Sequence, residues 1–131
     1  MSTILIVEDD GLVSMALQLR LQSLGYVVVT ARDVGSAEQQ AAAHRPDLIL
    51  TDICLPDGDG FAVARQLNRR ADGSFVPVVF ATASLDPAMK LRATHAQAAG
   101  FLQKPYTTEQ LLHTISQALL AGAPTGSDPV R

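Results

Sequence analysis

Short apolar runs recur along the chain and alternate with longer segments of helical period. The five runs lie at residues 4–7, 26–30, 48–51, 76–81 and 100–103. They are apolar almost throughout and do not alternate with polar residues, which is typical of strands covered on both faces. The pattern therefore predicts five strands and five helices.

The first and last helices carry boundary signals. In the first, apolar residues recur at three- and four-residue steps, and a glycine follows where helices commonly end. These residues are Val13, Leu17, Leu21 and Leu24, followed by Gly25. In the last helix, Thr107 and Gln110 have the spacing of a capping box. Its expected buried stripe consists of Leu111, Ile115 and Leu119.

An alternation of strands and helices favours a parallel sheet, because parallel neighbours need crossover connections and these are usually helices. At 131 residues, the chain has the size of a single domain. The segment 122–131, GAPTGSDPVR, has the composition of a flexible tail or a linker stub. We therefore expect one α/β domain over residues 1–121.

Composition and charge exclude several classes of protein. With 47% hydrophobic residues and a mean hydropathy of +0.17, the chain is typical of a soluble globular protein. The N-terminus lacks the basic start of a signal peptide, and the lone Cys54 cannot form an internal disulfide. We therefore expect a cytoplasmic protein with no membrane contact. A net charge of -3, with no basic run beyond Arg69 and Arg70, argues against direct binding of nucleic acid.

Polar side chains follow four of the predicted strands. Glu8, Asp9 and Asp10 follow the first strand, Asp52 the third, Thr82 the fourth and Lys104 the fifth. Ligands of an open parallel sheet bind at the carboxyl ends of its strands, so we expect these groups on one rim. Crowded acids raise each other's pKa unless a cation lies among them. Since oxygen ligands suit a hard divalent ion, the pattern predicts Mg²⁺.

Beside such an ion, Asp52 is a candidate nucleophile for aspartyl-phosphate chemistry. Phosphoryl transfer depends on positioning and on neutralising the charge of three equatorial oxygens. Mg²⁺ is expected at one oxygen, Lys104 at another, and Thr82 with nearby backbone N–H groups at the third. No other arrangement in the sequence uses all of these residues.

Four segments, in order, resemble the receiver domain of two-component response regulators. They are ILIVEDD, LILTDICLPDGDGF, PVVFATAS and FLQKPY, and the similarity extends from residue 3 to about 120. The resemblance implies a flavodoxin-like α/β fold, with a five-stranded parallel sheet of order 2-1-3-4-5 flanked by five helices. It also implies a signalling domain that catalyses its own phosphorylation and dephosphorylation. In that family, a sensor histidine kinase or a phosphotransfer protein supplies the phosphoryl group, and an unknown downstream protein would receive the signal.

The resemblance also assigns roles to residues. Asp52 would accept the phosphoryl group from a phosphohistidine. Glu8 and Asp9 match the acidic pair of the family, in which Asp9 would ligate Mg²⁺ directly and Glu8 would act mainly through water. Asp52 and the backbone carbonyl of Cys54 would supply the other protein ligands.

Thr82 and Lys104 match the hydroxyl and the lysine that lie beside the phosphoryl group in the family. Thr82 and Phe101 would form the switch, and Phe101 would change rotamer on activation. The switch would alter the face made by the helix before Gly100, the strand 100–103 and the last helix. The resemblance further implies a cis peptide bond between Lys104 and Pro105.

Two features depart from the family pattern. The first glycine after the fourth helix is Gly100, several residues later than in relatives, so we expect an irregular end to that helix. Phe101 lacks the hydroxyl that many relatives carry at this position. A signal through Phe101 would therefore travel by packing alone.

Other polar residues have simpler structural interpretations. Asp10 is expected in a loop or at a helix cap. Asp57 and Asp59 are expected to form the turn and the cap of the helix that starts near Gly60. The histidines are expected at the surface and not as metal ligands; they are His44, His95 and His113.

Two other interpretations of the whole chain are compatible with parts of the sequence. The chain could be the receiver of a hybrid histidine kinase or of a multidomain regulator, since its polar tail fits a linker. A haloacid-dehalogenase-like phosphatase also combines an Asp nucleophile with Mg²⁺ on a similar sheet. That enzyme needs a second Asp two residues after the nucleophile, where this chain has Cys54, so the sequence disfavours it.

Overall fold

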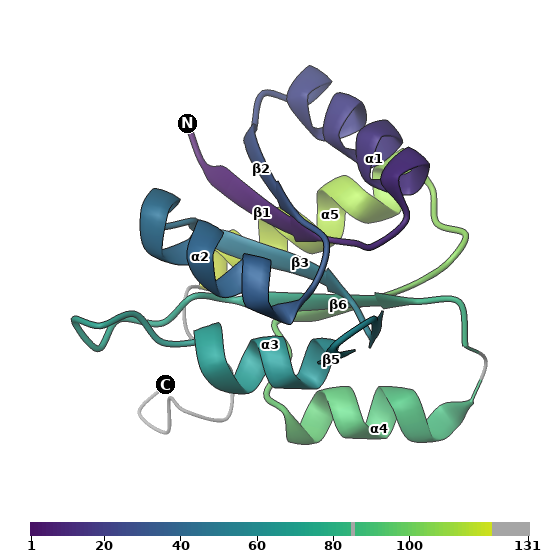
Figure 1. The fold of residues 1–131 in the computed structure, drawn as a ribbon. Helices are drawn as coiled ribbons and strands as arrows, with labels where there is room; N and C mark the ends of the chain where they lie inside the picture. The colour runs from purple at the N-terminus through teal and green to yellow at the C-terminus, as the bar shows by residue number, and fades with distance from the viewer. Residues whose placement is uncertain (85, 122–131) are drawn as a thin grey trace.

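A five-stranded parallel sheet forms the centre of the molecule, in the order β2-β1-β3-β6-β7 (Figure 1). Its strands are β1 (Thr3–Val7), β2 (Val27–Ala31), β3 (Leu48–Asp52), β6 (Val78–Thr82) and β7 (Gly100–Gln103). For the five predicted strands this is the order 2-1-3-4-5, so the flavodoxin-like topology is confirmed. The computed structural model describes residues 1–84 and 86–121, and the predicted tail at 122–131 lies outside the described residues.

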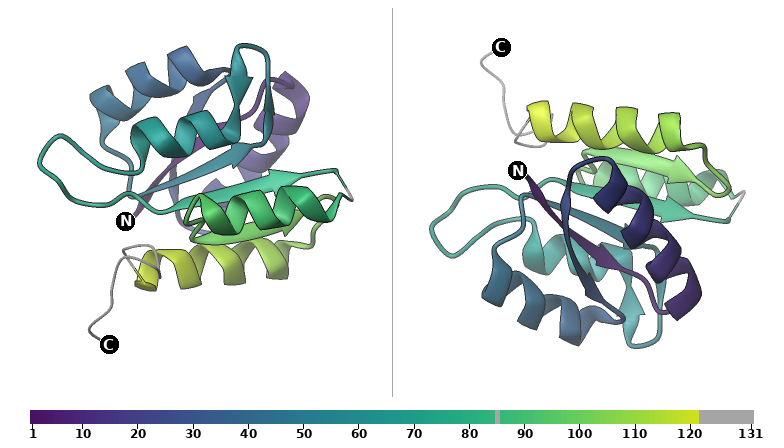
Figure 2. Two further views of the ribbon diagram at one scale, coloured as in Figure 1. Left: turned by 90° about the horizontal axis from the view of Figure 1, so that it is seen from below. Right: turned by 90° about the horizontal axis from the view of Figure 1, so that it is seen from above.

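Five helices in the described residues cover the two faces of the sheet (Figure 2). They are α1 (Gly11–Ser23), α2 (Val34–His44), α3 (Gly60–Leu67), α4 (Pro87–His95) and α5 (Thr108–Ala121). Helices α1 and α5 pack on one face, and α2, α3 and α4 pack on the other, each layer with its own apolar cluster. Within the same described ranges, no helix combines the length and the apolar character needed to span a membrane.

The central strands β1, β3 and β6 are buried on both faces, as their apolar runs predict. The two edge strands differ. Val27 of β2 is 44% exposed, and β7 is buried fully only at Leu102. The expectation that both faces are covered was therefore wrong for the two outer strands. Each has a neighbouring strand on one side only, so its side chains remain open to solvent on the other side.

The register of the sheet brings the carboxyl ends of the central strands together. Val7 of β1 lies beside Thr51 of β3, and Asp52 lies beside Ala81 of β6. The residues that follow β1 and β3 therefore emerge next to each other. This places the polar groups that follow the strands at one edge of the sheet.

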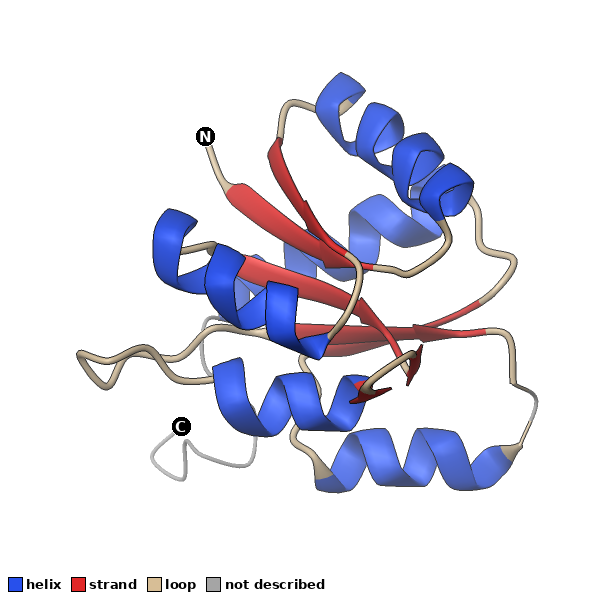
Figure 3. Ribbon diagram, viewed as in Figure 1, coloured by secondary structure: helices blue, strands red, loops and turns tan. Residues whose placement is uncertain are grey.

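A small hairpin that the sequence did not predict follows Asp52 (Figure 3). Strand β4 (Cys54–Leu55) pairs antiparallel with β5 (Gly58–Asp59), and Cys54 lies opposite Asp59. Strands of two residues are too short to show a periodic pattern in sequence. The hairpin leads directly into α3 and so links the end of β3 to that helix.

The last helix agrees with its predicted boundary. The N–H of Gln110 donates to the Thr107 hydroxyl at 3.0 Å, and the N–H of Thr107 donates to the Gln110 side chain at 2.8 Å. This is the predicted capping box. Of the predicted stripe, Leu111 and Ile115 are buried, and Leu119 is half-buried.

The first helix agrees only in part. Of the residues at helical spacing, Leu17 and Leu21 are buried, whereas Val13 is 40% exposed. Val13 lies in the first turn of α1, whereas Leu17 and Leu21 belong to the apolar cluster on this face of the sheet. The predicted end at Gly25 is confirmed, since this residue has φ +97° directly after the cap.

Helices α1 and α4 end in the same Schellman motif with different residues at its left-handed position. After α1 this residue is Gly25, and after α4 it is Gln97, with φ +59°. In both motifs the N–H of the left-handed residue donates at 3.0 Å and the next N–H donates at 3.1 Å to carbonyls of the preceding helix. The predicted irregular end of α4 was therefore wrong. The geometry is regular, and only the residue type is unusual.

Replacing Gln97 by glycine is expected to stabilise the protein by about 0.5–1 kcal/mol. A residue with a side chain costs roughly 1–2 kcal/mol in the left-handed region, and glycine removes this cost. Glycine also raises the entropy of the unfolded chain, which offsets part of the gain in stability. Urea unfolding followed by circular dichroism measures the difference. Gly25→Ala, the matched change in the other motif, should destabilise by a similar amount, and a Gln97→Gly variant less stable than wild type would contradict the assignment.

Candidate functional site

Three carboxylates converge at the carboxyl edge of the sheet. Glu8 and Asp9 follow β1, and Asp52 ends β3. One carboxylate oxygen from each lies within 4.8 Å of the other two. Glu8 is only 6% exposed, Asp52 is half-buried and Asp9 is exposed. The fold thus brings together the three acids that the sequence singled out, in a cluster with one side open to solvent.

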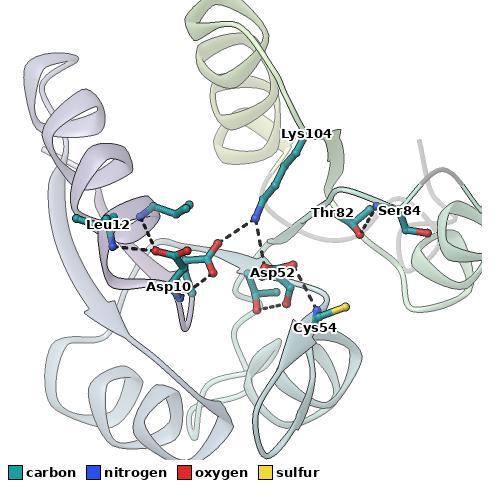
Figure 4. Close-up of polar contacts among 10 residues, drawn as sticks. Asp10, Leu12, Asp52, Cys54, Thr82, Ser84 and Lys104 are labelled. Atoms are coloured by element: carbon teal, nitrogen blue, oxygen red, sulfur yellow. Dashed lines mark hydrogen bonds and ion pairs between the residues drawn. The ribbon is translucent and has the colours of Figure 1, made fainter.

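Lys104 bridges two of these carboxylates (Figure 4). It extends from the segment after β7, and its Nζ donates to Glu8 Oε1 at 2.9 Å and to Asp52 Oδ2 at 3.2 Å. The backbone N–H of Lys104 donates to the carbonyl of Thr82 at 2.8 Å, which fixes this segment against β6. The peptide bond from Lys104 to Pro105 is cis, as the family resemblance implies.

Burial and charge oppose each other in this cluster. Burial raises the pKa of Glu8 above its usual value, although hydrogen bonds from Lys104 and from the backbone of Asp10 lower it. For Lys104, burial lowers the pKa, but the hydrogen bond to Glu8 and the charges of Asp52 and Glu8 raise it by more, so the net shift is upward. The ammonium is therefore held in its charged form. One positive charge among three acids still leaves part of their negative charge unbalanced.

The close approach of Gly60 fixes the backbone around Asp52. The N–H of Gly60 donates to the carbonyl of Ile53 at 2.8 Å, and a Cβ at Gly60 would lie 2.5 Å from the carbonyl oxygen of Asp52. The N–H of Cys54 donates to Asp52 Oδ1 at 3.3 Å. The start of α3 and the hairpin thus hold Asp52 from two sides. Sequence reasoning missed Gly60, because it does not stand out from the other glycines of its turn.

The aspartates around the cluster cap helices. Asp10 accepts from the first turn of α1 at 3.0 and 3.2 Å, and Asp59 accepts from the first turn of α3 at 2.9 Å, as predicted. Asp57 lies in the predicted turn, and its oxygens also accept from the N–H groups of Val34 and Gly35 at 2.8 and 3.1 Å, which was not predicted. It therefore supports the first turn of α2, whose N-cap is Asp33. The contact joins residues more than twenty positions apart, which no local sequence pattern reveals.

The other candidate residues lie around this centre. Thr82 ends β6 and is 2% exposed, and its hydroxyl accepts from the N–H of Ser84 at 3.1 Å (Figure 4). Phe101 is half-buried in β7 and packs against the apolar cluster beneath α2, α3 and α4. The side chain of Cys54 is exposed. The three predicted surface histidines are exposed as well; they are His44, His95 and His113.

Known proteins resemble the chain over nearly its whole length. A family model for the response regulator receiver domain matches residues 4–116. Protein PilH from Pseudomonas aeruginosa is 35% identical, over 93% of this chain and 100% of that protein. The KDP operon transcriptional regulatory protein KdpE from Escherichia coli is 34% identical, over 99% of this chain but only 57% of that protein. Among solved structures, the chemotaxis response regulator CheY4 of Vibrio cholerae is 30% identical with a TM-score of 0.81, over 90% of this chain and 98% of that one.

Gly60→Ala is expected to destabilise the protein by about 2–3 kcal/mol, because its Cβ would collide with the backbone of Asp52, which cannot yield as a side chain can. Urea unfolding measures the loss. Gly11→Ala is the matched control, since a Cβ at this helical glycine would meet nothing within 4 Å. It should leave stability unchanged or slightly improved. Equal stability of the two variants would contradict the close approach at Gly60.

Proposed function

Because the chain belongs to the response regulator receiver domain family, we propose that it is the phosphoacceptor domain of a two-component system, with Asp52 as the phosphorylated residue. The proposed domain comprises residues 1–121. One observation carries the assignment to Asp52. Its carboxylate ends a central strand, lies within the acidic cluster and contacts the Lys104 ammonium, while remaining partly open to solvent.

The donor set fits a hard divalent cation. Three carboxylates offer oxygen ligands, which Mg²⁺ prefers, and a single lysine leaves part of their charge unbalanced. Asp9 and Asp52 would hold Mg²⁺ directly, and Glu8 would act mainly through water. The backbone carbonyl of Cys54 would be a further ligand. When bound, Mg²⁺ would neutralise charge on the phosphoryl oxygens.

In the transfer step, a carboxylate oxygen of Asp52 attacks the phosphorus of a phosphohistidine on the donor protein. The new O–P bond forms as the P–N bond breaks, and the electron pair of that bond returns to the imidazole. Lys104 lies within hydrogen-bond distance of Asp52 and would neutralise one phosphoryl oxygen as it arrives. These groups position the reactants and balance charge, which is most of what phosphoryl transfer requires.

Thr82 and Phe101 are proposed to convert phosphorylation into a change of shape. The Thr82 hydroxyl would leave the N–H of Ser84 and turn to a phosphoryl oxygen. Phe101 lies on the neighbouring strand β7 and is half-buried, so it can repack when the end of β6 moves. The face made by α4, β7 and α5 would then change and bind a downstream protein.

The proposed phosphodonor is a sensor histidine kinase or a phosphotransfer protein, met in the cytoplasm. The chain matches PilH over that protein's full length, but it matches little more than half of KdpE. The same domain therefore suits a free-standing regulator, a multidomain regulator or a hybrid kinase. Direct contact with nucleic acid is not part of the proposal, since the chain has a net charge of -3.

Asp52→Asn is expected to abolish phosphorylation by acetyl phosphate in Mg²⁺, because an amide is both a poor nucleophile and a poor ligand. Intact-mass spectrometry measures the added phosphate. Asp72→Asn is the matched control, since Asp72 is an exposed residue of the loop between α3 and β6, at the opposite end of the sheet. An Asp52→Asn protein that gains one phosphate at the wild-type rate would refute the assignment.

Lys104→Ala is expected to keep the fold but to weaken the coupling between phosphorylation and shape. The lost ammonium contact with a phosphoryl oxygen should be worth roughly 1.5–3 kcal/mol. Phosphate-induced chemical-shift changes in NMR spectra report the coupling, with Arg65→Ala at an exposed position of α3 as a control. Equal phosphorylation rates and equal shift changes in Lys104→Ala and wild type would count against a role for Lys104.

A further inference from the structure

The guanidinium of Arg92 joins α4 to two other elements. Its central carbon lies 4.2 Å from the ring centroid of Phe61 in α3. One of its nitrogens lies 3.8 Å from Asp59 Oδ2 in the hairpin. Half of the Arg92 side chain remains exposed. One side chain therefore stacks on an aromatic face and pairs with a carboxylate at the same time.

Few other contacts fix α4. Ala93 is the only fully buried residue among Pro87–His95, and Met89 packs against the core only in part. A helix with so little buried apolar surface gains little from packing. The contacts of Arg92 with Phe61 and Asp59 are therefore a substantial part of what holds α4 in place.

One contact partner of Arg92, Asp59, is connected to Asp52 through the hairpin. Asp59 lies opposite Cys54 in the hairpin, and the N–H of Cys54 donates to Asp52 Oδ1 at 3.3 Å. On the other side, the ring of Phe61 packs on Phe80 at a centroid distance of 5.0 Å. Phe80 is the register partner of Phe101 in β7. Arg92 therefore contacts the hairpin next to Asp52. It also contacts Phe61, and through Phe80 this ring is connected to Phe101 in β7.

We propose that Arg92 is a positioning residue that ties α4 to the hairpin and to α3, and that phosphorylation of Asp52 loosens this tie. The regulatory half of the proposal rests on the proposed function, and the structural half does not. A phosphoryl group on Asp52 changes the carboxylate that accepts the N–H of Cys54, and the hairpin then shifts with Asp59. Because such coupling is reciprocal, a change that weakens the contacts of Arg92 also favours the conformation that phosphorylation favours.

Hydrogen exchange of α4 in the unphosphorylated protein tests the structural half. Arg92→Met keeps the length of the side chain and helix propensity but removes the charge and the planar group. Its α4 amides should exchange about 3- to 10-fold faster than those of wild type, with α5 unchanged. Arg92→Lys, which keeps the charge but not the stacking, should fall between them. Arg65→Met, at an exposed position of α3, is the matched control and should leave α4 unchanged.

Two partner variants make the test specific. Asp59→Asn keeps a good cap for α3 and removes the charge that faces Arg92. Phe61→Leu keeps an apolar side chain in the core and removes the aromatic face. Each should speed exchange of α4, and neither should add its full effect to that of Arg92→Met. The structural half would be overturned if α4 of Arg92→Met exchanged within twofold of the wild-type rate, or if Arg65→Met had an equal effect. Full additivity of the partner variants with Arg92→Met would overturn it as well.

Exchange in the presence of acetyl phosphate and Mg²⁺ tests the regulatory half. Phosphorylated wild type, verified by its mass, should show α4 exchange approaching that of Arg92→Met, and phosphorylation should change Arg92→Met much less. Unchanged α4 exchange in phosphorylated wild type would overturn the regulatory half. A protein that gains no phosphate would refute the proposed function and with it this half. The unphosphorylated variants would still decide whether Arg92 holds α4.

Discussion

The contact of the Lys104 ammonium with Glu8 and Asp52 joins the segment after β7 to the ends of β1 and β3. A buried carboxylate and a second one beside it are costly to bring together without an opposing charge. The lysine, which reaches both groups, therefore lowers the cost of this arrangement at the carboxyl ends of the strands. The cap at Asp10, the hairpin after Asp52 and the close approach of Gly60 all surround this contact and restrict how far its members can move.

The molecule combines a rigid centre with a lightly held rim. The three central strands are buried on both faces, so their register and the positions of the carboxylates cannot change without opening the core. Helix α4 buries little, and its Arg92, which contacts Asp59 and Phe61, is half exposed. A small chemical change at the rigid edge can therefore have its largest structural effect in an element that lies outside the core.

The sequence predicted the elements whose signals are local and the site residues whose order follows from the sheet. Apolar runs gave the five strands, and Asp52 and Lys104 could be placed on one rim because parallel strands share a carboxyl edge. Features that depend on contacts between distant segments were not predicted, as for Asp57, which supports the first turn of a helix far back in the chain. Val13 shares the helical spacing of Leu17 and Leu21 but is 40% exposed, because periodicity marks one side of a helix without showing which of its turns are covered. The regular end of α4 was not predicted, because Gln97 occupies the left-handed position at which glycine is usual.

The segment from Ile53 to Asp59 is fixed at both ends by contacts of different kinds. Asp57 reaches the start of α2, and Gly60 lies against the backbone of Asp52. One residue inserted into this segment, or deleted from it, would pull Asp57 off α2 and put a side chain where only Gly60 fits. Within the same segment, the side chain of Cys54 is exposed and can be exchanged. The length of this loop is therefore constrained, and substitution is tolerated at exposed positions such as Cys54 but not at the buried Ile53 and Leu55.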